Sequence, residues 1–170
     1  MLALLGATAS AQEVTYDYDK ATDFSRLKTY AWVDGRNLAD ELNHKRVIEA
    51  VDAQMAAKGY TKVEAGASPD VLVAYHAFFD RNLEVSTFSS GWGAYRFAPA
   101  RTGSARVEKI VVGTLAVDLV DAKTKTIVWR GIARKEVDVN ASPEKREKNI
   151  NRAVEKLFKK YPPKKTGKEA

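Results

Sequence analysis

The residues best suited to bind a ligand lie in one glycine-rich segment. Within residues 89–103, aromatic and arginine side chains alternate with glycine, serine and alanine, and the candidate contact residues are Trp92, Tyr95, Arg96, Phe97 and Arg101. Aromatic rings stack on sugars, bases or lipid headgroups, and guanidinium groups pair with anions. Loops of this length also often fold back and bury their own rings. The segment therefore predicts either a partner-binding loop or a self-packed one.

Material for acid–base or metal chemistry is scarce in this chain. It has two histidines and no cysteine, which removes thiol nucleophiles and zinc–thiolate sites. His76 lies within a predicted strand, where hydrogen bonds can satisfy a neutral imidazole, so we favour a structural role for it. The alternative is a polar site in which His76 works with a carboxylate. His44, at the polar start of a predicted helix, is expected on the surface, and no metal or cofactor site is expected.

The positive charge of the chain does not predict a nucleic-acid partner. The net charge is +6, but residues 159–170 hold five Lys and one Glu and so contribute +4 of it. The predicted last helix mixes acidic with basic residues instead of carrying a basic stripe. Gly91 and Gly93 are not followed by a Lys-Ser/Thr pair or a third spaced glycine, so a phosphate-binding loop is not expected.

Short stretches of alternating or β-branched apolar residues predict the strands that must position these groups. The predicted strands are residues 14–19, 29–33, 60–63, 71–79, 110–121 and 126–137. The last two form a hairpin around the turn at 121–125, whereas the periodicity is lost between 80 and 109. The run 71–79 is apolar on both faces, which predicts a central strand at least partly covered on both sides.

Two stretches with helical spacing complete the domain. The first spans about 40–58 and ends before Gly59; the second begins at the N-cap Ser142 and ends before Pro162. The apolar stripe of the second helix is Ile150, Ala153, Val154, Leu157, Phe158 and Tyr161. The order predicts a single α+β domain over residues 12–163, with a mostly antiparallel β-sheet, two amphipathic helices packed on one face and one long Gly/aromatic loop. Residues 164–170 are expected to form a disordered basic tail.

The N-terminal segment predicts export. Residues 1–11 carry no charged side chain and end in Ala9-Ser10-Ala11, the small-x-small pattern of a signal-peptidase site. The alternative is a small-residue arm packed on the domain. No other stretch reaches the roughly 18 apolar residues that span a bilayer, so no transmembrane segment is expected. The sequence therefore predicts a periplasmic or secreted protein.

Several motifs together are familiar, although each alone is weak. They are Val-Thr-Tyr-Asp-Tyr-Asp at 14–19, Asp-Phe-Ser-Arg-Leu-Lys-Thr-Tyr-Ala-Trp at 23–32, Ala-Lys-Gly-Tyr at 57–60, Pro-Asp-Val-Leu-Val-Ala-Tyr-His at 69–76, Gly-Thr-Leu at 113–115, Asp-Ala-Lys-Thr-Lys at 121–125, Val-Trp-Arg-Gly at 128–131, Pro-Glu-Lys-Arg at 143–146 and Tyr-Pro-Pro at 161–163. With them the chain resembles domain-of-unknown-function family 4136, small bacterial envelope proteins that include lipoproteins. The resemblance implies an envelope location and a single α+β domain. It supplies no activity, cofactor or catalytic residue.

Three hypotheses of function follow. The leading one is a non-enzymatic binding or assembly protein of the envelope, whose loop contacts a partner protein, glycan or anionic lipid. The second is a hydrolase or transferase that uses His76 with a carboxylate. The third is a structural envelope protein whose surfaces act in oligomers, and the sequence leaves the oligomeric state open.

Overall fold

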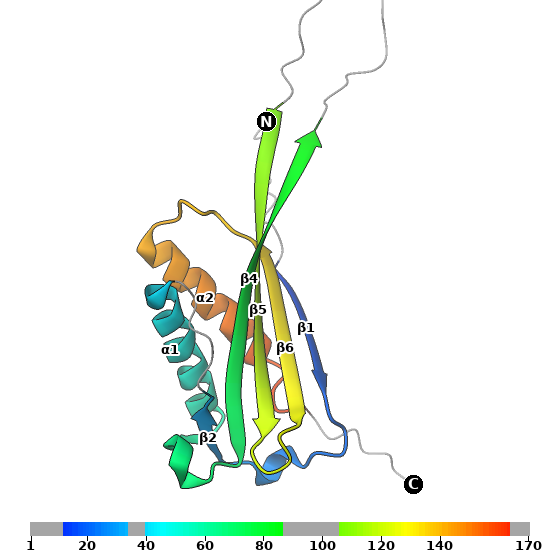
Figure 1. Ribbon diagram of the computed structural model, residues 1–170, viewed down its shortest axis with the longest axis vertical. Helices are drawn as coiled ribbons and strands as arrows, with labels where there is room; N and C mark the ends of the chain where they lie inside the picture. The colour runs from blue at the N-terminus through cyan, green and yellow to red at the C-terminus, as the bar shows by residue number, and fades with distance from the viewer. Residues whose placement is uncertain (1–11, 34–39, 87–105, 164–170) are drawn as a thin grey trace, which may run out of the picture.

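One sheet of six strands forms the body of the molecule, in the order β1-β6-β5-β4-β2-β3 (Figure 1). The computed structural model describes residues 12–33, 40–86 and 106–163. The strands are β1 (Glu13–Tyr18), β2 (Thr29–Trp32), β3 (Thr61–Lys62), β4 (Val71–Ser86), β5 (Arg106–Asp121) and β6 (Ile127–Glu136). β2 is parallel to both β3 and β4, and the other pairs are antiparallel. The predicted α+β class and mostly antiparallel sheet are confirmed.

Two helices cover one face of this sheet, as predicted. They are α1 (Glu41–Ala57) and α2 (Pro143–Phe158), and each begins at a side-chain cap, Asp40 for α1 and Ser142 for α2. The helices run in the same direction, so that both N-terminal ends lie toward the end of the sheet where β4 and β5 continue (Figure 1). Among the described residues, no helix has the length and apolar character needed to cross a membrane.

β4 and β5 are longer than their side-chain alternation predicts. They pair without interruption from Val71 opposite Asp121 to Ser86 opposite Arg106, whereas the sequence suggested a loss of regular structure from residue 80 onward. β6 follows β5 only to the pair Val112 and Glu136, so the far end of the β4–β5 ladder is a two-stranded ribbon. Backbone hydrogen bonds hold such a ribbon whatever the side-chain pattern, which is why alternation missed it.

The second face of β4 is not covered, contrary to expectation. β4 is central, between β5 and β2, but the side chain of His76 is 53% exposed and Phe78 is 56% exposed on the face away from the helices. No described element packs over these two residues, because α1 and α2 both lie on the opposite face. The apolar character of this strand therefore does not indicate burial on both sides.

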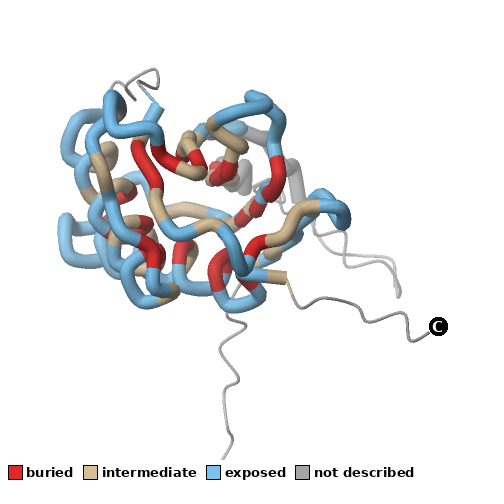
Figure 2. Tube along the Cα trace, turned by 90° about the horizontal axis from the view of Figure 1, so that it is seen from below, coloured by how far each residue is buried: buried red, intermediate tan, exposed pale blue. Residues whose placement is uncertain are grey.

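The core lies between the helices and the sheet, and the buried stretches of the chain trace lie toward the inside of the molecule (Figure 2). Among its largest fully buried side chains are Trp129, Phe158 and Tyr161, near the C-terminal end of α2. Trp129 of β6 is buried, and its ring centroid lies 5.4 Å from that of Phe158 and 5.1 Å from that of Tyr161. The predicted α2 stripe thus faces the core. Gly131 makes this packing possible, because a Cβ there would lie 2.5 Å from Cη2 of Trp129 and 3.0 Å from Cδ2 of Leu157.

We predict that Gly131→Ala destabilises the protein by about 1–3 kcal/mol, the usual cost of overpacking a core. Urea unfolding followed by far-UV circular dichroism measures this change. Gly66→Ala is the matched control, because a Cβ at Gly66 meets nothing within 4 Å. Equal stability of the two variants would show that Trp129 does not pack tightly over Gly131.

Candidate functional site

The loop expected to bind a partner lies outside the described residues. Its candidate contact residues are Trp92, Tyr95, Arg96, Phe97 and Arg101, all within 87–105. The strands that it connects are described, and Ser86 at the end of β4 pairs with Arg106 at the start of β5. The loop therefore starts and ends at the far end of the β4–β5 ribbon, and its role remains a prediction.

His76 lies on the uncovered face of the sheet. Its Nε2 is 3.8 Å from Oδ2 of Asp118 on β5, which is longer than a hydrogen bond. Its ring stacks with that of Phe78, and the two centroids are 6.4 Å apart. The fold thus brings a carboxylate close to His76, as the hydrolase hypothesis requires, but does not join the two by a hydrogen bond.

The carboxylate of Asp118 is held by Arg130 instead. Asp118 is buried, and Arg130, directly opposite on β6, donates from Nε to Oδ1 at 2.6 Å and from Nη2 to Oδ2 at 2.7 Å. The hydrogen bond to Asp118 raises the pKa of Arg130, because the carboxylate favours the charged guanidinium. Both carboxylate oxygens are engaged by this two-point contact. The pair is suited to join β5 to β6, and no carboxylate of the described residues accepts a hydrogen bond from His76 to orient its ring.

His44 is not a surface residue, contrary to the sequence prediction. It is half-buried, and its Nδ1 forms a hydrogen bond with the hydroxyl of Tyr75 on β4. Burial raises the pKa of that tyrosine. His44 precedes the buried Val47 by three residues, so it extends the core-facing side of α1 by one turn. Counting back three residues from Val47, nearly one helical turn, would have placed His44 on the core-facing side of the helix.

A pocket lies between the sheet and the N-terminal halves of both helices, and we call it the helix–sheet pocket. Its volume is about 350 Å³. The walls are mostly apolar and come from α1, β4, β5, β6 and α2, with Val47, Ala77, Phe79, Leu115, Val137, Ile150 and Ala153 among the lining residues. Phe79 and Val139 line it and remain 60% and 55% exposed. A pocket of this size and lining can take a small apolar group.

Small residues explain why the pocket exists at this end of the helices. The positions that line it include Ala77, Gly113, Ala133 and Ala153, whereas the other end of the layer holds Trp129 and its neighbouring aromatic rings. An added Cβ at Gly113 would already lie 3.0 Å from Cγ1 of Val137. The gap between helices and sheet is thus filled by large side chains at one end and left partly open at the other.

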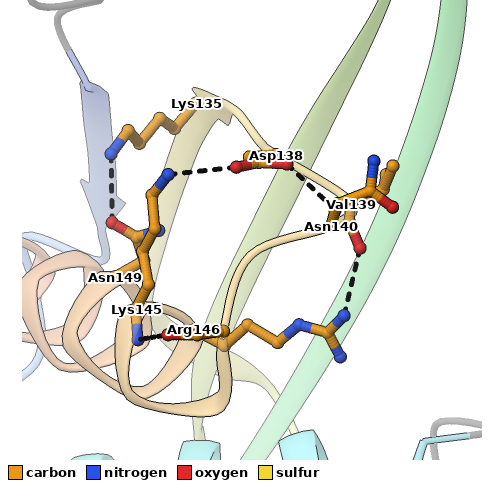
Figure 3. Close-up of polar contacts among 8 residues, drawn as sticks. Lys135, Asp138, Val139, Asn140, Lys145, Arg146 and Asn149 are labelled. Atoms are coloured by element: carbon orange, nitrogen blue, oxygen red, sulfur yellow. Dashed lines mark hydrogen bonds and ion pairs between the residues drawn. The ribbon is translucent and has the colours of Figure 1, made fainter.

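Polar residues form one rim of the pocket, between β6 and the start of α2 (Figure 3). Lys135 Nζ donates to Oδ1 of Asn149 at 3.2 Å, and Arg146 Nη2 donates to the carbonyl oxygen of Val139 at 3.0 Å. Asp138 pairs with Lys145, its Oδ2 lying 3.0 Å from Nζ. This ammonium, together with the backbone N–H of Asn140, holds the pKa of Asp138 below its usual range. The rim therefore contains one closed ion pair and two cations with neutral partners.

The sequence patterns do not predict this pocket. Its lining comes from segments as distant as Val47 and Ala153, and most of these side chains belong to ordinary apolar patterns. A signal was present in the small residues alone: Ala77, Gly113 and Ala133 occur at core-facing positions of three adjacent strands. Pairing those strands would have placed Ala77 and Ala133 in one row, with Leu115 between them, and Gly113 at the next core-facing position of β5.

Fold and pocket together define a two-layer α+β domain with a single helical layer and a ligand-sized hollow beneath it. The chain belongs to the family described as domain of unknown function DUF4136, whose model matches residues 14–163. The family resemblance inferred from the sequence is confirmed. No curated protein matches the chain significantly.

Solved structures resemble this chain at low sequence identity. A PDZ domain protein from Parabacteroides distasonis ATCC 8503 is 21% identical with a TM-score of 0.56, and the match covers 93% of this chain but 36% of that one. PelC of Paraburkholderia phytofirmans, a dodecamer, is 9% identical over 87% of this chain and 96% of that one, with a TM-score of 0.49. Lipoprotein GNA1162 of Neisseria meningitidis is 9% identical over 76% and 97%, with a TM-score of 0.41. The first likeness shows a common fold and nothing further.

We predict that Arg130→Met destabilises the protein by about 2 kcal/mol, because the buried carboxylate of Asp118 loses both charged donors. The control is Arg134→Met on the same strand, an exposed residue whose side chain has no hydrogen-bond or ion-pair partner among the described residues. It should change the stability by less than about 0.5 kcal/mol. Chemical unfolding of both variants checks the difference, and similar losses would contradict a special role for the Asp118–Arg130 pair.

Proposed function

We propose that this chain is a non-enzymatic binding module of the bacterial cell envelope, and that the helix–sheet pocket is its ligand site. The observation that carries the proposal is an apolar hollow of about 350 Å³ whose mouth includes two large, mostly exposed side chains, Phe79 and Val139. When a ligand covers such surface, the free energy of binding becomes more favourable by about 25 cal/mol for each Å² of apolar area removed from water. A ligand with a slender aliphatic group gains this free energy.

The chemistry of the lining favours an aliphatic group over a sugar or a nucleobase. Aliphatic side chains dominate the walls, and Phe79 is the one aromatic ring among the described lining residues. Sugars and bases are generally held by stacked rings and several directed hydrogen bonds. The side chains that form hydrogen bonds and ion pairs near this pocket, such as Lys135 with Asn149 and Asp138 with Lys145, lie at its rim. A hydrocarbon chain needs no polar partner inside.

The positions of the titratable groups support a binding role over a hydrolytic one. Neither His76 nor His44 lines the pocket, and His76 lies on the other face of the sheet. The two carboxylates at the pocket are engaged, since Asp40 caps α1 and Asp138 pairs with Lys145. A general base would need to reach a substrate held there.

An envelope location is supported by the sequence. Residues 1–11 carry the small-x-small pattern of a signal peptide, and they lie outside the described residues. The aromatic–arginine loop remains part of the proposal as a second contact, because its ends leave the ribbon that extends beyond the pocket. In this arrangement the pocket holds a small ligand and the loop meets a larger partner.

We predict that Ala153→Leu weakens binding of the neutral fluorescent probe N-phenyl-1-naphthylamine about tenfold, because three additional carbon atoms enter the pocket. Titration of the probe against the protein, followed by its emission, measures the affinity. Ala56→Leu, an exposed alanine on α1, is the control for the same substitution elsewhere on the helical layer and should bind as the wild type does. Unchanged affinity in Ala153→Leu would locate any probe binding elsewhere and contradict the proposed site.

A further inference from the structure

We propose that the ligand of the helix–sheet pocket is a single-chain amphiphile with an anionic headgroup, held at the rim by Lys135 and Arg146. The inference rests on the proposed function of the pocket and adds the chemical class of its occupant. The hydrocarbon chain would lie between the sheet and the N-terminal halves of α1 and α2. The carboxylate or phosphate would stay at the water-exposed rim, where the two cations lie.

The two cations at the rim have neutral hydrogen-bond partners. Lys135 donates to an amide oxygen of Asn149, and Arg146 donates to the backbone carbonyl of Val139. Neither cation lies within 4.0 Å of a described carboxylate oxygen, unlike Lys145, which is paired with Asp138. A carboxylate or phosphate adds a Coulomb attraction that a neutral oxygen lacks. An acidic headgroup therefore interacts more favourably with these cations than their present partners do.

The charges around the mouth do not cancel. Asp138 is neutralised by Lys145, and the Asp40 carboxylate accepts hydrogen bonds from the backbone and side-chain nitrogens of Asn43. Among the described lining residues, Asp40 is then the remaining anion and Lys135 and Arg146 are the remaining cations, which leaves this rim positive. A cationic headgroup would meet repulsion here, and a neutral one would gain no ion pair.

The direction of the helices adds to the positive potential. α1 and α2 both point their N-terminal ends toward the pocket, and residues from the first two turns of each helix line it (Figure 1). The unpaired N–H groups at a helix start carry a partial positive charge. Asp40 and Ser142 already cap the two starts, so the helix dipoles act as a background field and Lys135 and Arg146 supply the full charges.

The two cations lie on different elements of the fold. Lys135 follows Ala133 on the helix-facing side of β6, and Arg146 lies one turn into α2, so they approach the rim from different layers. In Figure 3 their charged ends lie on either side of the Asp138–Lys145 pair. A headgroup seated against this rim can contact one cation directly while the other adds to the local potential. Both side chains are therefore expected to contribute.

The test compares three twelve-carbon amphiphiles below their critical micelle concentrations: dodecanoate, dodecyltrimethylammonium and dodecyl maltoside. Displacement of N-phenyl-1-naphthylamine from the wild-type protein gives each affinity. We expect dodecanoate to bind at least about tenfold more tightly than the cationic amphiphile. Dodecyl phosphate, run alongside dodecanoate, distinguishes a phosphate headgroup from a carboxylate.

Variants locate the headgroup. Lys135→Gln and Arg146→Gln should each lower the ratio of dodecanoate affinity to dodecyl maltoside affinity about fivefold. Lys148→Gln is the matched control, because it removes the same charge from an exposed position of α2 outside the pocket lining. Equal affinity for the three amphiphiles, with Ala153→Leu still blocking them, would overturn the headgroup assignment alone. Amphiphile binding that Ala153→Leu does not affect would overturn the pocket assignment as well.

Discussion

The packing of Trp129 between Gly131 and the C-terminal half of α2 is the contact on which the rest of this structure depends. The indole occupies the space that Gly131 leaves because it has no Cβ, and the rings of Phe158 and Tyr161 pack against the indole. This aromatic cluster sets the distance between the helical layer and the sheet. Since a helix is stiff over four turns, the spacing imposed at one end of α2 is carried to the other. The small residues at that other end cannot fill the same gap, and the pocket results.

Charged side chains are paired differently on the two faces of the sheet. On the uncovered face, the carboxylate of Asp118 is removed from water and fully occupied by Arg130, which ties two strands together. On the helical face, the charges stay at the edge of an apolar hollow, and two of them keep only neutral partners. A closed ion pair resists further binding, because any new partner must first displace the old one. A cation bonded to a neutral oxygen keeps its charge uncompensated, so it still attracts an added anion, and the second face is the better place for a ligand.

Much of the fold is readable from local patterns in the sequence. The spacing of Val47, Val51 and Met55, the Ser142 cap and the alternation in β5 each report a local geometry, and the structure confirms them. Other features depend on where segments meet. Alternation along β4 could not tell that both helices lie on the same face, so His76 and Phe78 were expected to be covered more than they are. The pocket was missed for a related reason: periodicity shows which side chains face inward, but not whether their volumes fill the space.

An unfilled apolar pocket lowers stability, because the atoms that line it lose contacts on one side. A ligand that enters the pocket restores those contacts in the folded state alone, so binding and stability are linked. In this molecule a bound ligand would stabilise the N-terminal halves of α1 and α2. The opposite ends of these helices are already fixed by the aromatic cluster. The ligand would therefore complete a layer that the chain's own side chains fill at one end only. The ribbon of β4 and β5 leaves the body beside this region. Occupancy of the pocket is thus positioned to influence how rigidly the base of that ribbon is held.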